Sequence, residues 1–180
     1  MWLKKRTCGG CDPQSRRLSW ILSLIAVTAA SPVMAQSGLI LTGSDEVPVL
    51  NYKLDFDGVE RRLDRWRLNI PAQDVAVAEV QMSCESRFDG NVDLDDIRLE
   101  VEGQPVPLYD TFWNEEFKSL EVQIEAPVAA GQEMRLILSN VRNPTAGFYR
   151  CDGRLLGTEA NPLYRYIGNW IVTINSRRDE

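Results

Sequence analysis

Apolar and polar residues alternate with a period of two along most of this chain. Ile97, Leu99 and Val101 share one face of an extended backbone, and the residues between them are charged. Similar runs lie at residues 66–70, 78–84, 120–124, 134–138 and 166–174. Because successive side chains of a β-strand point to opposite faces, the alternation predicts antiparallel sheets with one face buried and one face in water.

Turn-forming residues separate these runs. They occur at residues 102–105 (EGQP), 130–132 (AGQ), 143–144 (NP) and 161–162 (NP). About seven short strands separated by such turns are typical of two packed sheets. We therefore predict an all-β fold over residues 59–180, an antiparallel β-sandwich with immunoglobulin-like general architecture. Residues 36–58 are less periodic, and we expect a poorly specified N-terminal arm there.

Residues 1–35 have the pattern of a secretory signal peptide. Basic residues precede an apolar run at residues 18–30, and Ala35 ends a cleavage site of small residues. Cleavage would leave Gln36 as the mature N-terminus. The alternative is an uncleaved membrane anchor, but a spanning helix needs about 20 apolar residues and Pro32 interrupts this run early. We expect export and no membrane span in the mature chain, and the sequence leaves open the periplasm, the envelope and the medium as destinations.

The chain is acidic, with a net charge of −6 at pH 7. Loss of residues 1–35 removes five basic residues and one acidic residue, which makes the mature charge −10. An acidic surface repels nucleic acid and anionic lipid headgroups, and the basic clusters at residues 61–62 and 177–178 are short. The sequence therefore disfavours a nucleic-acid partner and leaves an envelope protein or a glycan as possible partners.

The sequence contains no histidine. This excludes His-dependent nucleophilic catalysis and His-ligated zinc, and the sequence has no nucleophile-elbow or phosphate-loop motif. The enzymatic alternative is a small carboxylate-dependent hydrolase acting on envelope polysaccharide. Its candidate acids are Asp55 with Asp57, Glu115 with Glu116, and the loop that begins at Asp89. Because neighbours on a strand point to opposite faces, adjacency is no evidence for a pair, and we expect a non-enzymatic protein with no catalytic residues.

Four cysteines are present, and the expected cleavage divides them. Cys8 and Cys11 form a C-x-x-C pair that would be removed with the signal peptide, whereas Cys84 and Cys151 remain in the mature chain. Two thiols that are exported to an oxidising compartment usually pair. We therefore predict a disulfide between Cys84 and Cys151, and two separate buried thiols are the alternative.

The acidic loop from Asp89 to Asp96 imitates the spacing of a calcium loop. Side-chain oxygens recur at alternate positions, and Glu100 follows eleven residues after Asp89. An EF-hand needs glycine at the sixth position, where this chain has Leu94, so the loop fails as an EF-hand. Two interpretations stay open, an irregular calcium site in a calcium-stabilised structural domain or a solvated turn with local hydrogen bonds. We assign no metal ligand and no cofactor.

Aromatic residues are numerous for a small sheet protein. Trp66 and Trp170 share faces with aliphatic residues, so we expect both in the core, whereas Phe112 and Trp113 lie outside any clean strand and are candidates for exposure. Exposed aromatic patches often mark interaction sites, and a flat aromatic platform on a β-sandwich is one way to bind sugars. These residues indicate a possible glycan-binding face.

Several segments of the chain form a combination that is fairly specific as a set. They are residues 88–90, 95–101, 103–108, VRNP at 141–144 and NPLYRYIGNWIVTI at 161–174. The combination resembles a family of secreted cyanobacterial proteins that is known only as a domain of unknown function. The resemblance implies export and a small β-rich domain, and it carries over no catalytic or ligand residues. We therefore expect an exported, non-catalytic binding or interaction module of the cell envelope or periplasm.

Overall fold

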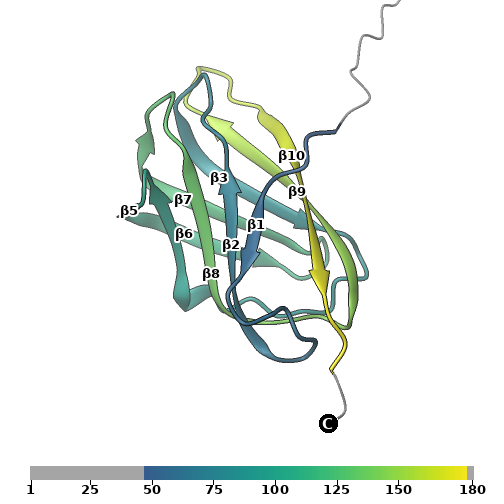
Figure 1. The fold of residues 1–180 in the computed structure, drawn as a ribbon. Helices are drawn as coiled ribbons and strands as arrows, with labels where there is room; N and C mark the ends of the chain where they lie inside the picture. The colour runs from purple at the N-terminus through teal and green to yellow at the C-terminus, as the bar shows by residue number, and fades with distance from the viewer. Residues whose placement is uncertain (1–46, 178–180) are drawn as a thin grey trace, which may run out of the picture. The chain divides into compact units, whose positions relative to one another are not determined.

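Ten β-strands and one short 3-10 helix make up the part of the chain that the structure describes (Figure 1). The structure is a computed structural model that describes residues 47–177. The signal peptide, its cleavage position between Ala35 and Gln36, and the Cys8/Cys11 pair lie outside the described residues. The elements are β1 (Tyr52–Leu54), β2 (Leu63–Ile70), β3 (Val77–Cys84), η1 (Leu94–Asp96), β4 (Ile97–Val101), β5 (Gln104–Val106), β6 (Leu108–Asn114), β7 (Ser119–Val128), β8 (Met134–Arg142), β9 (Gly147–Gly157) and β10 (Tyr164–Ile174).

The strands form two five-stranded antiparallel sheets. The first sheet has the order β1-β2-β8-β4-β5, and the second sheet has the order β10-β9-β3-β7-β6. This arrangement confirms the predicted all-β antiparallel sandwich. Alternation in the sequence does not indicate β1, β5, β6 or β9, because β1 and β5 are three residues long, β6 exposes aromatic residues, and glycines interrupt the buried face of β9.

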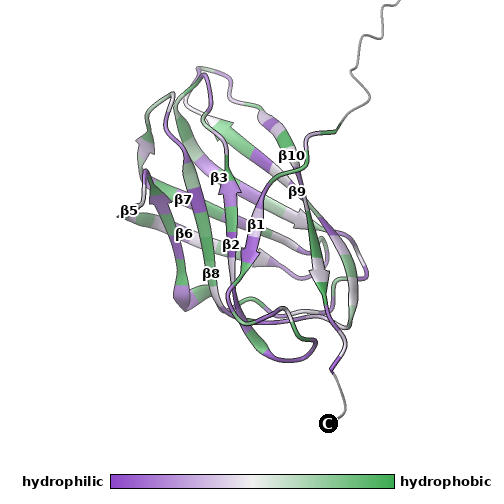
Figure 2. Cartoon of the chain, viewed as in Figure 1, coloured by the Kyte–Doolittle hydropathy of each residue, from purple (hydrophilic) through white to green (hydrophobic). Residues whose placement is uncertain are grey.

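The inner faces of the two sheets meet in one hydrophobic core. Trp66 and Trp170 are fully buried there, as the sequence predicts, and the rings of Phe88 and Trp66 form a T-shaped pair with centroids 5.9 Å apart. Gly153 makes room for Trp170, because a Cβ at that position would lie 2.9 Å from the indole ring. Figure 2 shows hydrophobic and hydrophilic residues alternating along the strands. Each large buried side chain stabilises the fold by about 1.5–3 kcal/mol.

A disulfide between Cys84 and Cys151 joins β3 to β9 within the second sheet. The two cysteines lie directly opposite each other in the strand register and are 67 residues apart in sequence. The bond confirms the predicted pairing. It fixes the register of the two strands at the end of β3, beside the buried Phe88 and Tyr149.

The segment that leads into β1 connects the two sheets. The Leu50 N–H donates to the Asn169 carbonyl at 2.7 Å, and the Asn169 N–H donates to the Pro48 carbonyl at 2.8 Å. Gly168 has a φ of +136° and permits this close approach, because a Cβ there would lie 2.4 Å from the Pro48 oxygen. The segment therefore covers part of the edge of β10 before β1 pairs with β2 in the first sheet.

Candidate functional site

The acidic loop is held by hydrogen bonds from distant parts of the chain. Asp89 accepts hydrogen bonds from the backbone N–H of Thr145 at 2.9 Å, from its hydroxyl at 2.7 Å and from the Arg61 guanidinium at 2.7 Å. Asp93 caps η1 by accepting a backbone N–H at 3.1 Å. Among the described residues, no group of three or more acidic or cysteine side chains is arranged to hold a metal ion. Asp93 therefore makes the local hydrogen bond that a turn predicts, whereas Asp89 holds the loop to Arg61 and Thr145, which are distant in sequence.

The carboxyl group of Asp89 links the stability of the domain to pH. Burial alone would raise the pKa of Asp89, but the hydrogen bonds from Thr145 and the charge of Arg61 outweigh burial and lower the pKa. A carboxylate whose pKa is lowered by folding stabilises the folded protein at pH values above its pKa in the unfolded chain, about 3.9. That contribution is lost as the pH falls through the lower pKa of the folded state.

We expect Asp89→Asn to reduce stability at pH 7 by about 1 kcal/mol, since the carboxylate is partly screened by solvent. At about pH 2.5 wild type and variant should differ less than at pH 7, because this pH lies below the unfolded pKa of about 3.9 and the contribution of the carboxylate is being lost there. Urea unfolding at the two pH values measures this difference. Asp74→Asn, at a largely exposed carboxylate, is the matched control. A difference between wild type and Asp89→Asn that stays constant with pH would contradict the assignment.

The candidate acids Asp55 and Asp57 have different surroundings. Asp55 accepts hydrogen bonds from Nε of Arg67 at 2.9 and 3.1 Å, and its carboxylate lies 3.4 Å from Nζ of Lys53. Burial alone would raise the pKa of Asp55, but Arg67 and Lys53 outweigh it and lower the pKa. Asp57 lies in the turn that follows β1, at a φ of 66°. A general acid needs a raised pKa, and the pKa of Asp55 is shifted in the opposite direction.

Glu115 and Glu116 lie in the hairpin between β6 and β7. Glu115 accepts hydrogen bonds from Lys118 and from the indole N–H of Trp113, and these bonds lower the pKa of Glu115. The backbone N–H of Glu116 donates to the side chain of Asn114 at 3.0 Å. Both residues therefore take part in the hydrogen bonding of the hairpin, and the pKa of Glu115 is shifted in the direction opposite to the one that a proton donor in glycoside hydrolysis requires.

Phe112 and Trp113 are adjacent on β6 and have different environments. Phe112 is 54 % exposed, as the sequence predicts, whereas Trp113 is half-buried and packs against the core. Phe112 lies directly opposite Glu121 of β7, and its side chain therefore lies on the outer face of the second sheet. Of the two aromatic residues that were candidates for exposure, Phe112 is therefore the one that is available on the predicted glycan-binding face.

A polar hollow lies on the outer face of the second sheet, beside Phe112. Its volume is about 400 Å³, and it is lined by Gln81, Ser83, Asn114, Phe117, Ser119, Glu121 and Arg154. The Gln81 amide donates to Glu121 at 3.1 Å and accepts from Arg154 at 3.4 Å. Phe117, at the tip of the adjoining hairpin, is 65 % exposed. The hollow therefore offers amide, hydroxyl, carboxylate and guanidinium groups beside an exposed aromatic ring.

Tyrosine side chains lie at the opposite edge of this outer face. The Tyr164 hydroxyl, on β10, donates to the carboxylate of Glu79 on β3, two strands away. Because two strand spacings amount to about 9.6 Å, the phenol must extend along the sheet over Leu156 of β9. Burial raises the pKa of Tyr164, and the hydrogen bond to Glu79 raises it further. Tyr164 and its neighbour Tyr166 remain partly exposed, so aromatic rings flank the polar face on both sides.

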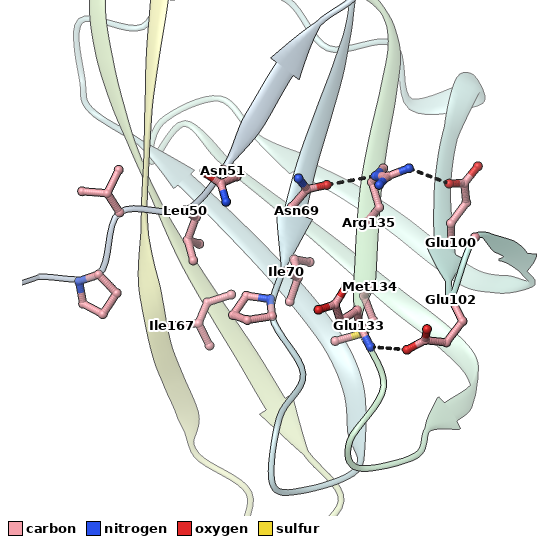
Figure 3. Close-up of a pocket in the computed structure, with 14 residues that line it drawn as sticks. Leu50, Asn51, Asn69, Ile70, Glu100, Glu102, Glu133, Met134, Arg135 and Ile167 are labelled. Carbon is pink, nitrogen blue, oxygen red and sulfur yellow. Dashed lines mark hydrogen bonds and ion pairs between the residues drawn. The ribbon is translucent and has the colours of Figure 1, made fainter.

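A larger groove extends from the outer face of the first sheet to Ile167 of β10, and its volume is about 580 Å³. In Figure 3, Arg135 lies between Asn69 and Glu100, and Leu50 and Ile167 form the apolar side of the groove. Arg135 Nε donates to Asn69 at 2.9 Å, and its Nη1 lies 3.7 Å from Glu100. This groove could not be predicted from the sequence, because its walls come from β2, β4, β8, β10 and the segment before β1.

The fold and its surfaces define a disulfide-bonded, two-sheet antiparallel β-sandwich domain. The chain belongs to the family described as "Protein of unknown function (DUF2808)", whose sequence profile matches residues 40–174. No curated protein matches the chain. Within residues 47–177, no helix is long and apolar enough to cross a membrane.

Solved structures with similar architecture have little sequence similarity to this chain. The bacterial hydrophobin BslA is 14 % identical, covers 74 % of this chain and 99 % of its own, and has a TM-score of 0.48. The collagen-binding domain of a Staphylococcus aureus adhesin is 8 % identical, with coverages of 72 % and 98 % and a TM-score of 0.38. An uncharacterised Nocardia farcinica protein with an immunoglobulin-like fold is 9 % identical, with coverages of 69 % and 96 % and a TM-score of 0.36.

Proposed function

We propose that this protein is a non-catalytic binding module of the cell envelope, exported by a cleaved signal peptide as a secreted protein of the cyanobacterial type. The envelope ligand is a glycan, and it binds on the outer face of the second sheet. The disulfide between Cys84 and Cys151 supports export, because such bonds persist in oxidising compartments. The observation that carries the proposal is the polar hollow, which lies between Phe112 and Phe117 on one side and the tyrosines of β10 on the other.

The chemistry of this face fits a sugar chain. A pyranose ring has hydroxyl groups around its edge and C–H groups on its faces, so it needs hydrogen-bonding side chains next to flat apolar rings. Gln81, Glu121 and Arg154 form a connected set of donors and acceptors in the hollow. Five strands at about 4.8 Å spacing make the face about 19 Å wide. An extended oligosaccharide can therefore contact the hollow and an aromatic edge at once.

We expect the protein to co-sediment with purified, protein-free cell-wall glycan, and Phe112→Ala/Phe117→Ala to weaken this binding at least tenfold. The loss corresponds to about 0.7 kcal/mol or more for each aromatic contact. Both rings are largely exposed, so the fold should be retained. Phe56→Ala is the matched control, because Phe56 is 55 % exposed and lies in the turn after β1.

The same incubation tests the hydrolytic alternative. Release of new reducing ends during incubation with the glycan would show turnover and would contradict a non-catalytic module. Equal binding by wild type and Phe112→Ala/Phe117→Ala would contradict the assignment of the site to the second sheet.

A further inference from the structure

Five cations from four strands lie together on the outer face of the first sheet. They are Lys53 on β1, Arg65 and Arg67 on β2, Arg98 on β4 and Arg135 on β8, and we refer to them as the basic face. The strand register places Lys53 opposite Arg67, Arg67 opposite Ile137, and Ile137 opposite Arg98. Three of the cations therefore belong to one row that crosses four strands.

The carboxylates on this face are fewer than the cations. The carboxylate of Asp55 lies within 4 Å of the charged groups of Lys53, Arg65 and Arg67, so one carboxylate forms ion pairs with three cations. Asp96 pairs with Arg98, and Glu100 pairs with Arg135.

Each of these carboxylates is also less exposed than the cations with which it pairs. The side chain of Asp55 is 13 % exposed, whereas those of Lys53 and Arg98 are 72 % and 67 % exposed. With the five cations against Asp55, Asp96 and Glu100, the face has a net charge of +2 on a chain whose net charge is −6. The electrostatic interaction between charges weakens with distance and with screening by solvent and salt. An approaching ligand therefore interacts more strongly with the projecting cations than with the carboxylates beneath them.

The cationic groups are held in place before any ligand binds. Ile137 points to the outer face, because its neighbours Leu136 and Leu138 belong to the core, yet Ile137 is buried. Its cross-strand neighbours Arg67 and Arg98 flank it, and the long aliphatic stems of arginine cover apolar surface in this way. Arg67 is held further by its two hydrogen bonds to Asp55. Such preorganisation reduces the entropy lost on binding.

The groove continues the basic face with groups that recognise hydroxyls. Asn51 and Asn69 line it beside Arg135, whereas Glu102 and Glu133 lie at its other end (Figure 3). We propose that the basic face and the adjoining part of this groove bind an acidic polysaccharide, a chain in which carboxylate or sulfate groups recur between hydroxyl-bearing sugars. This site is on the opposite sheet from the glycan site proposed above and does not depend on it.

The arrangement fits a linear polyanion of this kind. Three strand spacings of about 4.8 Å separate Lys53 from Arg98, so the row extends about 14 Å, and a single phosphate-sized group cannot contact both ends. The strand register places no aromatic residue in the row from Lys53 to Arg98, so the row offers no ring on which an unpaired base could stack. The rest of the described surface is acidic, and it would be repelled by a membrane whose surface is uniformly anionic.

The test measures binding of the purified protein to polygalacturonate, which carries carboxylates, and to dextran sulfate, with neutral dextran as the reference. We expect binding to at least one polyanion, no binding to dextran, and at least a fivefold loss of affinity when NaCl rises from about 50 to about 200 mM. Comparison of the two polyanions shows which acidic group is preferred. Lys53→Gln/Arg98→Gln should weaken binding about tenfold, and both side chains are too exposed for the fold to depend on them.

Two further variants separate the electrostatic role from a structural one. Glu100→Gln should tighten polyanion binding, because it removes a negative charge beside Arg135. Arg150→Gln/Arg165→Gln makes the same charge change as the test variant on strands of the second sheet and should leave affinity within twofold. Failure to bind either polyanion at 50 mM NaCl, or equal losses in the two double variants, would overturn the proposal. Stronger binding to phosphatidylglycerol vesicles or to single-stranded DNA than to either polysaccharide would also overturn it, in favour of that other class of partner.

Discussion

Replacing Cys84 and Cys151 together by alanine should lower the free energy of unfolding by about 4 kcal/mol and the melting temperature by about 10–15 °C. The physical reason is the length of chain that the disulfide closes, with the two cysteines 67 residues apart. In the loop-entropy model, a cross-link of this length restricts the unfolded chain strongly, so unfolding gains less entropy. Alanine is preferred to serine, because both positions are buried and a hydroxyl there would add a second penalty.

Urea and thermal unfolding of the oxidised protein, the reduced protein and the alanine variant measure the effect. Reduced wild type should resemble the variant, and reductant should leave the variant unchanged. The m-value of the variant should increase, because an unfolded chain without the cross-link exposes more surface. Identical melting temperatures of wild type with and without reductant would contradict a stabilising bond.

The strands that the sequence predicts are those whose own residues alternate between apolar and polar side chains. Residues 97–101 alternate between apolar and charged side chains, and a turn at residues 102–105 ends the run, so β4 can be found without knowing its neighbours. The order of the strands is not a local property. β8 lies between β2 and β4 because inner faces from distant parts of the chain pack together, and nothing in its own residues indicates these partners.

The same distinction separates the predicted sites from the missed ones. Cys84 and Cys151 are the two cysteines that follow the expected cleavage position, and export to an oxidising compartment would by itself favour their pairing. Asp89 resembles the first ligand of a calcium loop, but its partners Arg61 and Thr145 are 28 and 56 residues away, and the sequence does not place them together. The basic face was missed for the same reason, because Lys53 and Arg98 share one row only through the register of four strands. The net charge of −6 suggested a uniformly acidic surface, whereas the cations of the basic face gather on one sheet.

Asn143 stands at the centre of a buried hydrogen-bond network that attaches the turn after β1 to the core. Its side-chain oxygen accepts the indole N–H of Trp66 at 2.9 Å, and its nitrogen donates to the Val59 carbonyl at 2.9 Å and to Asp64 at 3.2 Å. Asp64, also buried, accepts the backbone N–H groups of Phe56 and Gly58. Asn143, the asparagine of the VRNP segment at residues 141–144, therefore has a structural role in this fold.

Asn143→Ala should destabilise the domain by about 2–4 kcal/mol. It leaves the buried indole N–H of Trp66 unsatisfied, at about 1–3 kcal/mol, and it removes one hydrogen bond each from the Val59 carbonyl and from Asp64, at about 0.5–1.5 kcal/mol each. These two acceptors keep the backbone N–H groups of Arg62 and Gly58 as partners. Asn91→Ala, at an exposed asparagine near β8, is the control and should cost less than about 0.5 kcal/mol. A double-mutant cycle with Trp66→Phe tests the mechanism. Phenylalanine has no N–H to leave unpaired, so Asn143→Ala should cost about 1 kcal/mol less in the Trp66→Phe background. Strict additivity of the two changes would mean that the cost comes from lost packing and that the hydrogen bond between Trp66 and Asn143 contributes nothing.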